Sequence, residues 1–476
     1  MSLKHKSVAL IVLLSFGGCA FSSMEDRAKQ KPISSYETAK SFDAAAANWV
    51  QSEWWKSYND VQLNELIAEG LKGSPDIAAI LARVNQAASF TQVSQSALLP
   101  QLGANAAVTS EKLSYNNIIP APFTPNGWQD YGQGTINFSW EIDFWGKNRA
   151  ALAAATSEFE AINAEKSQIS LALAATIATS YAELAQLFAI RDTIASSIDV
   201  RKKALNLFKE RFKNGLETKA SVKEAEARLA NVEGELLAID EQIALIKNRI
   251  AALLGAGPDR GLKITRPNTS LINKFVLPNE LALNLLGRRP DIVAARLQVE
   301  AKESKIKQRK AAFYPNVNLS AFIGLQSLGL NMLTNSGSDI GSVGPAIYLP
   351  IFTGGRLSGE LKGAEASYDE AVANYNKTVT YALQDVANAG VSQKALSSQI
   401  SKANEATNAA EGAYKIAKNR YEWGLANYIE VLYAADNLLV SQRSLANLKA
   451  RSLILDIAMN RALGGGYIDA TKNIKG

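Results

Sequence analysis

Two copies of one long pattern make up most of this chain, and this duplication restricts the folds that it can adopt. Three short matches separate the copies by 215 residues at first and by 209 further on: 75–77 with 290–292, Pro100 with Pro315, and 211–216 with 420–425. Solenoid proteins stack much shorter units, of about 20–45 residues. The sequence therefore predicts an old tandem duplication with one order of elements in each half.

The matches divide the chain into six segments. We expect two repeats joined by a proline-containing linker, with a leader and a short segment before them and a tail behind. Their predicted bounds are 1–18 for a signal peptide, 19–59 for a lipidated N-terminal segment, 60–255 for the first repeat, 256–279 for the linker, 280–467 for the second repeat and 468–476 for the tail.

Each repeat is predicted to contain very long helices. A helix that begins at Pro-Asp comes first, over 75–98 and 290–313. Residues 147–214 then contain neither proline nor glycine, and a helix of that length spans ~100 Å at 1.5 Å per residue. Residues 355–423 form a similar stretch. Shorter return helices are expected over 216–254 and 425–463, after turns at about 211–218 and 420–427.

Between the first and second helices of each repeat, the sequence alternates with period two. Ile136, Phe138 and Trp140 point one way, and the polar residues between them point the other. This pattern predicts strands. A soluble sandwich shows the same alternation, and the pattern also suits a transmembrane sheet with lipid on one side and water on the other. We expect two strands in each repeat, over 101–117 and 129–145 and over 316–333 and 340–352. Four strands cannot close a barrel, so strands in lipid would require several copies of the chain.

The only cysteine and the only histidine both lie near the N-terminus. Lys4, His5 and Lys6 precede an apolar run, 7–16, which is too short to span a bilayer and is typical of an export signal. Small residues then lead to Cys19 in an order that resembles a bacterial lipobox, although Phe16 stands where leucine is usual. We expect Cys19 to carry lipid; an ordinary secretory signal is the alternative.

Cleavage before Cys19 would leave a chain without histidine, which disfavours the commonest acid–base catalysis and zinc sites. We therefore predict no catalytic, cofactor-binding or metal-binding residues and no enzyme activity. The chain is only mildly basic, with a formal charge of +6, and its sequence contains no Lys/Arg block, so no nucleic-acid partner is expected.

Several segments together resemble the TolC-like outer-membrane factor family, in the lipoprotein branch of RND-type multidrug efflux channels (NodT/OprM-like). They are Cys19, LLGRRPDI (285–292), AAFYPNVNLSAFIG (311–324), LPIFTGGRL (349–357), RYEWGLANYIEVL (420–432) and ALGGGY (462–467). The resemblance implies a mainly α fold with a membrane β-barrel. It implies a homotrimer with a 12-stranded barrel in the outer membrane of a Gram-negative bacterium and a 12-helix α-barrel in the periplasm.

The resemblance also implies partners and site residues. The partners would be a periplasmic adaptor (membrane fusion) protein, an inner-membrane RND-type transporter and outer-membrane lipid. The two turns would form the periplasmic tip that meets the adaptor, and the helix after the second turn would line a pore constriction. The corresponding residues are Arg211, Gly215, Leu216, Arg420, Gly424 and Leu425 at the tip, and Ile429, Glu430 and Tyr433 at the constriction.

The leading hypothesis is a passive exit duct of a tripartite efflux pump, without cofactor. A duct for type I protein secretion is the first alternative. A periplasmic coiled-coil scaffold without a pore is the second alternative. The export signal and the strand pairs argue against a cytosolic or fibrous coiled coil. Glu430 has two interpretations, a ring of constriction residues or a solvated helix residue. Tyr433 stands where relatives of the lipoprotein branch often carry aspartate, so the sequence leaves open which side chain closes the gate.

Overall fold

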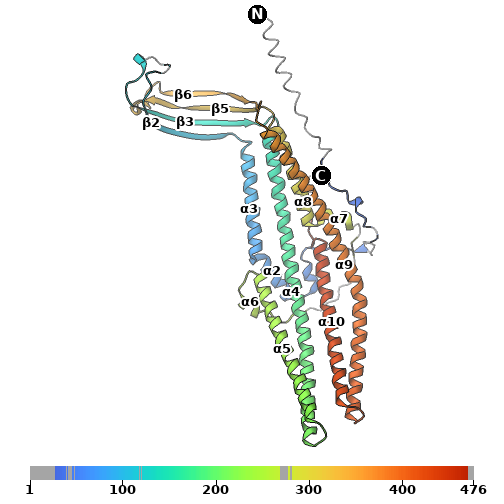
Figure 1. Cartoon of the computed structure of the whole chain (residues 1–476). Coiled ribbons are helices and arrows are strands. Elements are labelled where there is room, and N and C mark those ends of the chain that lie inside the picture. Colours follow the sequence, from blue (N-terminus) through green and yellow to red (C-terminus); the bar gives the residue numbers. More distant parts are fainter. Residues whose placement is uncertain are drawn as a thin grey trace. The chain divides into compact units, whose positions relative to one another are not determined.

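The computed structural model describes most of the chain (Figure 1). The described residues are 27–38, 40, 46–47, 49–116, 118, 121–268, 277–278 and 281–469. The predicted signal peptide and Cys19 lie outside the described residues, as do 269–276 in the predicted linker and 470–476 in the predicted tail. The chain divides into two compact units, and the longest helices contribute residues to both.

The helices repeat the duplication of the sequence. In the first half they are α2 (Val61–Gly73), α3 (Pro75–Ser96), α4 (Lys147–Lys213), α5 (Lys219–Leu253) and α6 (Pro258–Leu262). In the second half they are α7 (Leu281–Arg288), α8 (Pro290–Ala311), α9 (Arg356–Glu422) and α10 (Tyr428–Ala462). Because α4 and α9 both have 67 residues and α5 and α10 both have 35, the predicted long and short helices are confirmed in each half.

The remaining elements are short. They are the 3-10 helices η2 (Ile33–Ser35), η3 (Trp54–Tyr58), η4 (Ala121–Phe123) and η5 (Leu330–Met332), and the two-residue strands β1 (Ala46–Ala47) and β4 (Leu277–Pro278), which pair in parallel.

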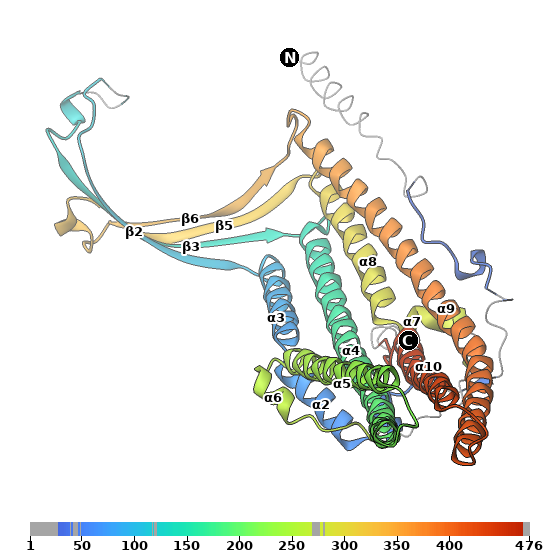
Figure 2. The ribbon, with the colours of Figure 1, turned by 60° about the horizontal axis from the view of Figure 1, so that its bottom comes forward.

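One unit, which includes 95–154 and 299–376, carries a four-stranded antiparallel sheet. Its strands, in spatial order, are β2 (Gln101–Glu111), β3 (Gln129–Ile142), β5 (Asn316–Leu328) and β6 (Asp339–Tyr348). Figure 2 shows the four strands side by side. The four predicted strands are thus confirmed. β2 ends earlier than expected because its partner β3 begins at Gln129, the residue that pairs with Glu111.

The register places the predicted apolar residues of β3 on the same face of this sheet as apolar residues of β5. Ile136 lies opposite Ile323, and Trp140 lies opposite Leu319. Successive side chains of a strand point to opposite faces, so Asn137 and its polar neighbours lie on the other face. The sheet therefore has one apolar and one polar face, as the alternation predicted.

Aromatic residues mark the end of the sheet where strands give way to helices. The Trp145 and Tyr314 rings stack with centroids 4.7 Å apart, and the Trp145 indole N–H donates to the Pro315 carbonyl at 2.9 Å. The Asp143 side chain caps the N-terminal end of α4, because its carboxylate accepts the backbone N–H groups of Asn148 at 3.1 Å and Arg149 at 2.8 Å. Amphipathic aromatic residues of this kind favour the level of the lipid headgroups.

The other unit, which includes 32–94, 155–298 and 377–469, contains the main apolar core. Leu66, Ile177 and Ile250 are fully buried and join α2, α4 and α5. A buried polar group lies at the edge of this core. The Asp60 carboxylate caps α2 by accepting a hydrogen bond from the Leu63 N–H at 3.1 Å, and it also accepts one from the Tyr181 hydroxyl at 2.9 Å.

Two matched glycines end the return helices. Gly255 follows α5 with φ +75°, and a Cβ there would lie 2.3 Å from the Gly73 carbonyl oxygen. Gly464 follows α10 with φ +88°, and a Cβ there would lie 1.9 Å from the Arg288 carbonyl oxygen. Only glycine fits such a left-handed position against another backbone segment. The end of α5 therefore packs against the junction between α2 and α3, and the end of α10 packs against the junction between α7 and α8.

Candidate functional site

The two turns between long and short helices have the same backbone geometry. After α4, Gly215 adopts φ +69° and the Leu216 N–H donates to the Arg211 carbonyl at 2.8 Å. After α9, Gly424 adopts φ +73° and the Leu425 N–H donates to the Arg420 carbonyl, also at 2.8 Å. A left-handed glycine with this hydrogen bond is the Schellman ending of a helix.

Side-chain caps then start the return helices. The Thr218 hydroxyl accepts the Ser221 N–H at 3.1 Å, and the Asn427 side chain accepts the Ile429 N–H at 3.3 Å. These caps set the first helical residues at Lys219 and Tyr428, so the return helices begin three residues later than predicted. The turns leave Leu216 and Leu425 largely in solvent, with 65% and 70% of their surfaces exposed.

The two predicted tip arginines have different partners. The Arg420 guanidinium lies 3.3 Å from a Glu430 carboxylate oxygen and donates to the Leu425 carbonyl at 3.3 Å. The Arg211 guanidinium lies 5.9 Å from the centre of the Tyr421 ring. The difference follows from the sequence, because the first repeat has Ser221 where the second has Glu430.

An aromatic cluster joins the two helical hairpins near the turns. The Tyr428 ring packs edge-on against Phe208 of α4, with centroids 5.0 Å apart, and against Tyr421 of α9, at 4.8 Å. Burial raises the pKa of Tyr428 to about 12, so its hydroxyl is neutral at physiological pH. The cluster fixes the start of α10 against α4 of the first hairpin.

The predicted constriction residues occupy the first two turns of α10. Ile429, Glu430 and Tyr433 are all exposed in the single chain, and Glu430 is the residue that pairs with Arg420. The Tyr433 ring lies 5.9 Å from the Arg228 guanidinium of α5. Glu430 thus contacts the arginine at the turn between α9 and α10, and Tyr433 contacts the first hairpin.

Asp436 was not among the residues expected from the sequence. It lies one turn beyond Tyr433, and its carboxylate binds two arginines of the first hairpin, Arg201 of α4 and Arg228 of α5, the latter at 3.1 Å. Arg201 is buried, with 7% of its surface exposed. The available signal was an acidic residue three positions after Tyr433, but its partners stand more than 200 residues away.

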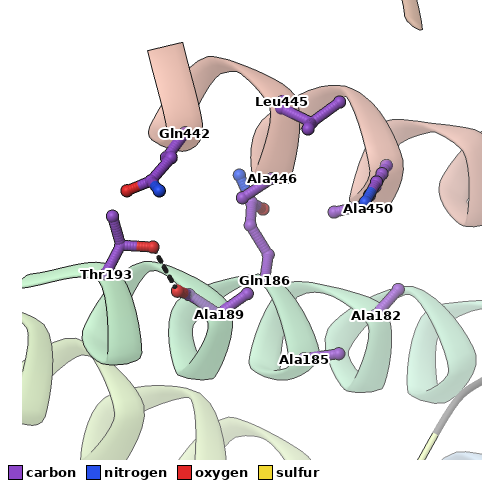
Figure 3. Close-up of a pocket in the computed structure, with 10 residues that line it drawn as sticks. Ala182, Ala185, Gln186, Ala189, Thr193, Gln442, Leu445, Ala446 and Ala450 are labelled. Atoms are coloured by element: carbon purple, nitrogen blue, oxygen red, sulfur yellow. Dashed lines mark hydrogen bonds between the residues drawn. The ribbon is translucent and has the colours of Figure 1, made fainter. Parts of the chain in front are cut away.

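Further along the same helices, a recess of about 270 Å³ lies between α4 and α10 (Figure 3). Alanines such as Ala182, Ala189 and Ala446 line it, and amides stand at its sides. The Gln186 amide donates to Asn447 at 2.8 Å and so bridges the two helices. The small side chains leave space between helices that polar contacts join.

Comparison with known proteins identifies the fold. The model of the family "Outer membrane efflux protein" matches residues 66–256 and 281–465. The chain belongs to the outer membrane efflux protein family. Both repeats are matched, and the sheet and the long helices described above fall within the matched ranges.

Two known proteins are similar over most of the chain. The Multidrug resistance outer membrane protein MdtP of Escherichia coli (strain K12) is 29% identical over 459 residues, which cover 94% of each chain. The Fusaric acid resistance protein FusA of Burkholderia cepacia is 34% identical over 374 residues, 75% of this chain and 68% of that one.

Solved structures of outer membrane proteins have similar folds. The outer membrane protein VceC of Vibrio cholerae is 46% identical, with a TM-score of 0.83 over 88% of this chain and all of that one. The outer-membrane channel OprN is 25% identical, with a TM-score of 0.82 over 94% and 98%. The expected family, the mainly α fold class and the outer-membrane location are confirmed, as is the role of an efflux channel. The family is one of channels and not of enzymes.

Proposed function

We propose that three copies of the chain form one exit duct, in which each copy contributes four strands to a twelve-stranded barrel. The observation that carries this proposal is the sheet with one apolar face and two outer strands, β2 and β6. Unpaired strand edges are not tolerated in lipid. Because neighbouring strands alternate in direction from β2 to β6, the β6 edge of one copy can pair antiparallel with the β2 edge of the next.

The two helical hairpins of each copy continue this barrel as a periplasmic tube of twelve helices. The polar face of the sheet then lines water and the apolar face meets lipid. Cys19 carries acyl chains that add to the anchoring by the barrel. The chain performs no chemistry and uses no cofactor, because passage through a duct requires only a continuous water-filled path.

The turns at the ends of the hairpins dock the periplasmic adaptor, which connects the duct to an inner-membrane transporter of RND type. Leu216 and Leu425 supply exposed apolar contacts. Gly215 and Gly424 hold the turns in shape, and Arg211 and Arg420 stand beside them. Exposed leucines at two equivalent turns suit a partner that binds both repeats in the same way.

The duct is narrowed at the start of α10, where Ile429, Glu430 and Tyr433 repeat three times around the axis. A threefold ring of Glu430 favours cations over anions. The ion pairs of Asp436 with Arg201 and Arg228 tie α10 to the first hairpin. Opening requires α10 to move outward, so these pairs hold the narrow state and adaptor docking releases it.

The cargo includes small-molecule drugs, because the similar MdtP of Escherichia coli is a multidrug resistance outer membrane protein. The test is deletion of the gene in a strain that lacks its other outer-membrane ducts. We expect several-fold lower inhibitory concentrations for unrelated drugs, restored by the intact gene. Unchanged drug susceptibility together with loss of a secreted protein from the medium would instead indicate a protein secretion duct.

The anchoring is tested by Cys19→Ser. A chain whose sheet spans the membrane stays in the outer-membrane fraction after this change. Release of the variant into the soluble periplasmic fraction would contradict the barrel and favour a lipid-tethered scaffold.

A further inference from the structure

Phe322 of β5 is the one phenylalanine of the four strands on the polar face of the sheet, a face that also carries Tyr131 of β3 and Tyr348 of β6. Phe322 of β5 lies directly opposite Asn137 of β3. Its neighbours on the same face of β5 are Ser320 and Gly324, because side chains two residues apart share a face. The residue keeps 37% of its surface exposed. Phe322 is therefore an apolar group in a row of polar and small residues.

The backbone keeps the space beside this ring free of another side chain. A Cβ at Gly324 would lie 2.1 Å from the Gly134 carbonyl oxygen and 2.9 Å from the Thr135 side chain. No larger residue fits there without moving β3. The next position of β5 on the same face as Phe322 is thus restricted to glycine.

A hollow of about 260 Å³ lies on this face. It is lined by Asn105, Ala107, Gln133, Thr135, Asn137 and Phe322, which come from three neighbouring strands. The three amides supply both hydrogen-bond donors and acceptors. Asn137 already donates to the Thr135 hydroxyl at 3.2 Å, which orients that amide. None of the six lining residues carries a charge.

We propose that this hollow is a contact site for uncharged aromatic solutes that carry amide or hydroxyl groups. The solute ring packs against Phe322, and its polar groups bond to Asn105 and Gln133. The proposal rests on the proposed duct, in which the polar face lines the lumen and the site occurs three times. It names the class of cargo that the membrane section of the duct holds longest.

The chemistry of the lining makes the contact weak and independent of charge. A channel conducts only when its sites bind cargo loosely enough to release it. Because no charged group takes part, the affinity is the same in dilute and concentrated salt, whereas contacts between exposed charges are screened. Weak, salt-independent and aromatic-dependent binding is the signature of this site.

Saturation-transfer difference NMR on the full-length protein in detergent tests the proposal, with 4-hydroxybenzamide as the probe. We expect Phe322→Leu to weaken binding roughly fivefold, as the loss of one aromatic contact predicts. Phe322→Tyr keeps the aromatic ring and should bind like the unchanged protein. Phe322→Met, which nearly conserves volume, replaces the leucine variant if that one fails to fold.

The matched control is Phe138→Leu, the same change on the apolar face of the neighbouring strand. It should leave binding unchanged. Equal binding by the Phe322→Leu and unchanged proteins overturns the proposal, as does equal weakening by both phenylalanine variants. Binding that falls steeply with added KCl also overturns it.

Conductance in planar bilayers separates this proposal from the duct itself. If the protein conducts and 4-hydroxybenzamide interrupts the current less often in Phe322→Leu, both hold. Conduction with interruptions that do not depend on Phe322 overturns the site and leaves the duct intact. Absence of any pore contradicts the duct, and the NMR comparison still decides whether the hollow binds the probe.

Discussion

Ile136 of β3 and Ile323 of β5 lie directly opposite each other on the apolar face of the sheet, and both are exposed in the single chain, by 56% and 68%. Two neighbouring isoleucines that face outward from a sheet are stable against lipid and unstable against water. This pair is therefore a direct marker of the surface that meets the membrane.

The first prediction concerns this surface. Ile323→Lys places a charge against lipid, which costs about 2–4 kcal/mol near the middle of a membrane. We expect a strong loss of the folded protein from outer membranes, measured by heat-modifiable gel mobility. Gln133→Lys, on the polar face of β3, is the matched control and should insert normally. Equal insertion of both variants would contradict the assignment of the faces.

The second prediction concerns the turn after α9. Gly424 has φ +73°, so Gly424→Ala strains the backbone and should destabilise the protein by about 1 kcal/mol. Gly412 lies inside α9 with open space around it, so Gly412→Ala should stabilise the helix by up to about 1 kcal/mol. Thermal unfolding of the two variants should shift in opposite directions. A shift in the same direction would show that backbone conformation does not decide the effect.

The third prediction concerns the ion pair of Arg420 and Glu430. Both side chains are about half exposed, so the pair contributes at most about 1 kcal/mol. Arg420→Lys keeps the charge but loses the planar group that also reaches the Leu425 carbonyl. We expect little change in thermal stability and weaker binding of the adaptor, measured by surface plasmon resonance. Arg443→Lys, far from the turn, is the control and should bind the adaptor normally.

The fourth prediction concerns pH. Burial raises the pKa of the Asp456 carboxyl, which accepts the Tyr58 hydroxyl at 2.5 Å and the Asn460 amide at 3.1 Å. The folded state therefore holds this proton at a higher pH than the unfolded state, whose pKa is about 3.9. As pH falls through the raised pKa, protonation stabilises the folded state.

Asp456→Asn removes this dependence while it keeps a hydrogen-bonding side chain at the position. The difference in unfolding temperature, unchanged protein minus variant, should increase as pH falls from neutral toward the unfolded pKa of about 3.9. A difference that stays constant, or that decreases on acidification, would show that Asp456 has no raised pKa in the folded protein.

The secondary structure of this chain follows closely from its sequence because the relevant signals are local. The alternation around Ile136 and Phe138 is a property of a few adjacent residues, and the lack of proline and glycine over 147–214 allows one long helix. The second return helix begins at Tyr428, later than the sequence predicts, because its start depends on a cap formed by the single side chain of Asn427.

The contacts between hairpins could not be read in the same way. Asp436 meets Arg201 and Arg228 across more than 200 residues of sequence, and only the packing of α10 against α4 and α5 brings them together. The position of Phe322 beside Asn137 is a second contact of this kind. Its surroundings depend on the register of β3 and β5, which no local pattern gives.

The most direct test of the duct is the ionic current through the purified protein in planar bilayers, before and after Asp436→Ala. The unchanged protein should form pores of low conductance, and the variant, with α10 released from Arg201 and Arg228, should conduct at least about twice as much. The control Asp456→Asn, away from the turns, should conduct like the unchanged protein. Absence of any pore in both the unchanged protein and the Asp436 variant would contradict the account of this chain as an exit duct.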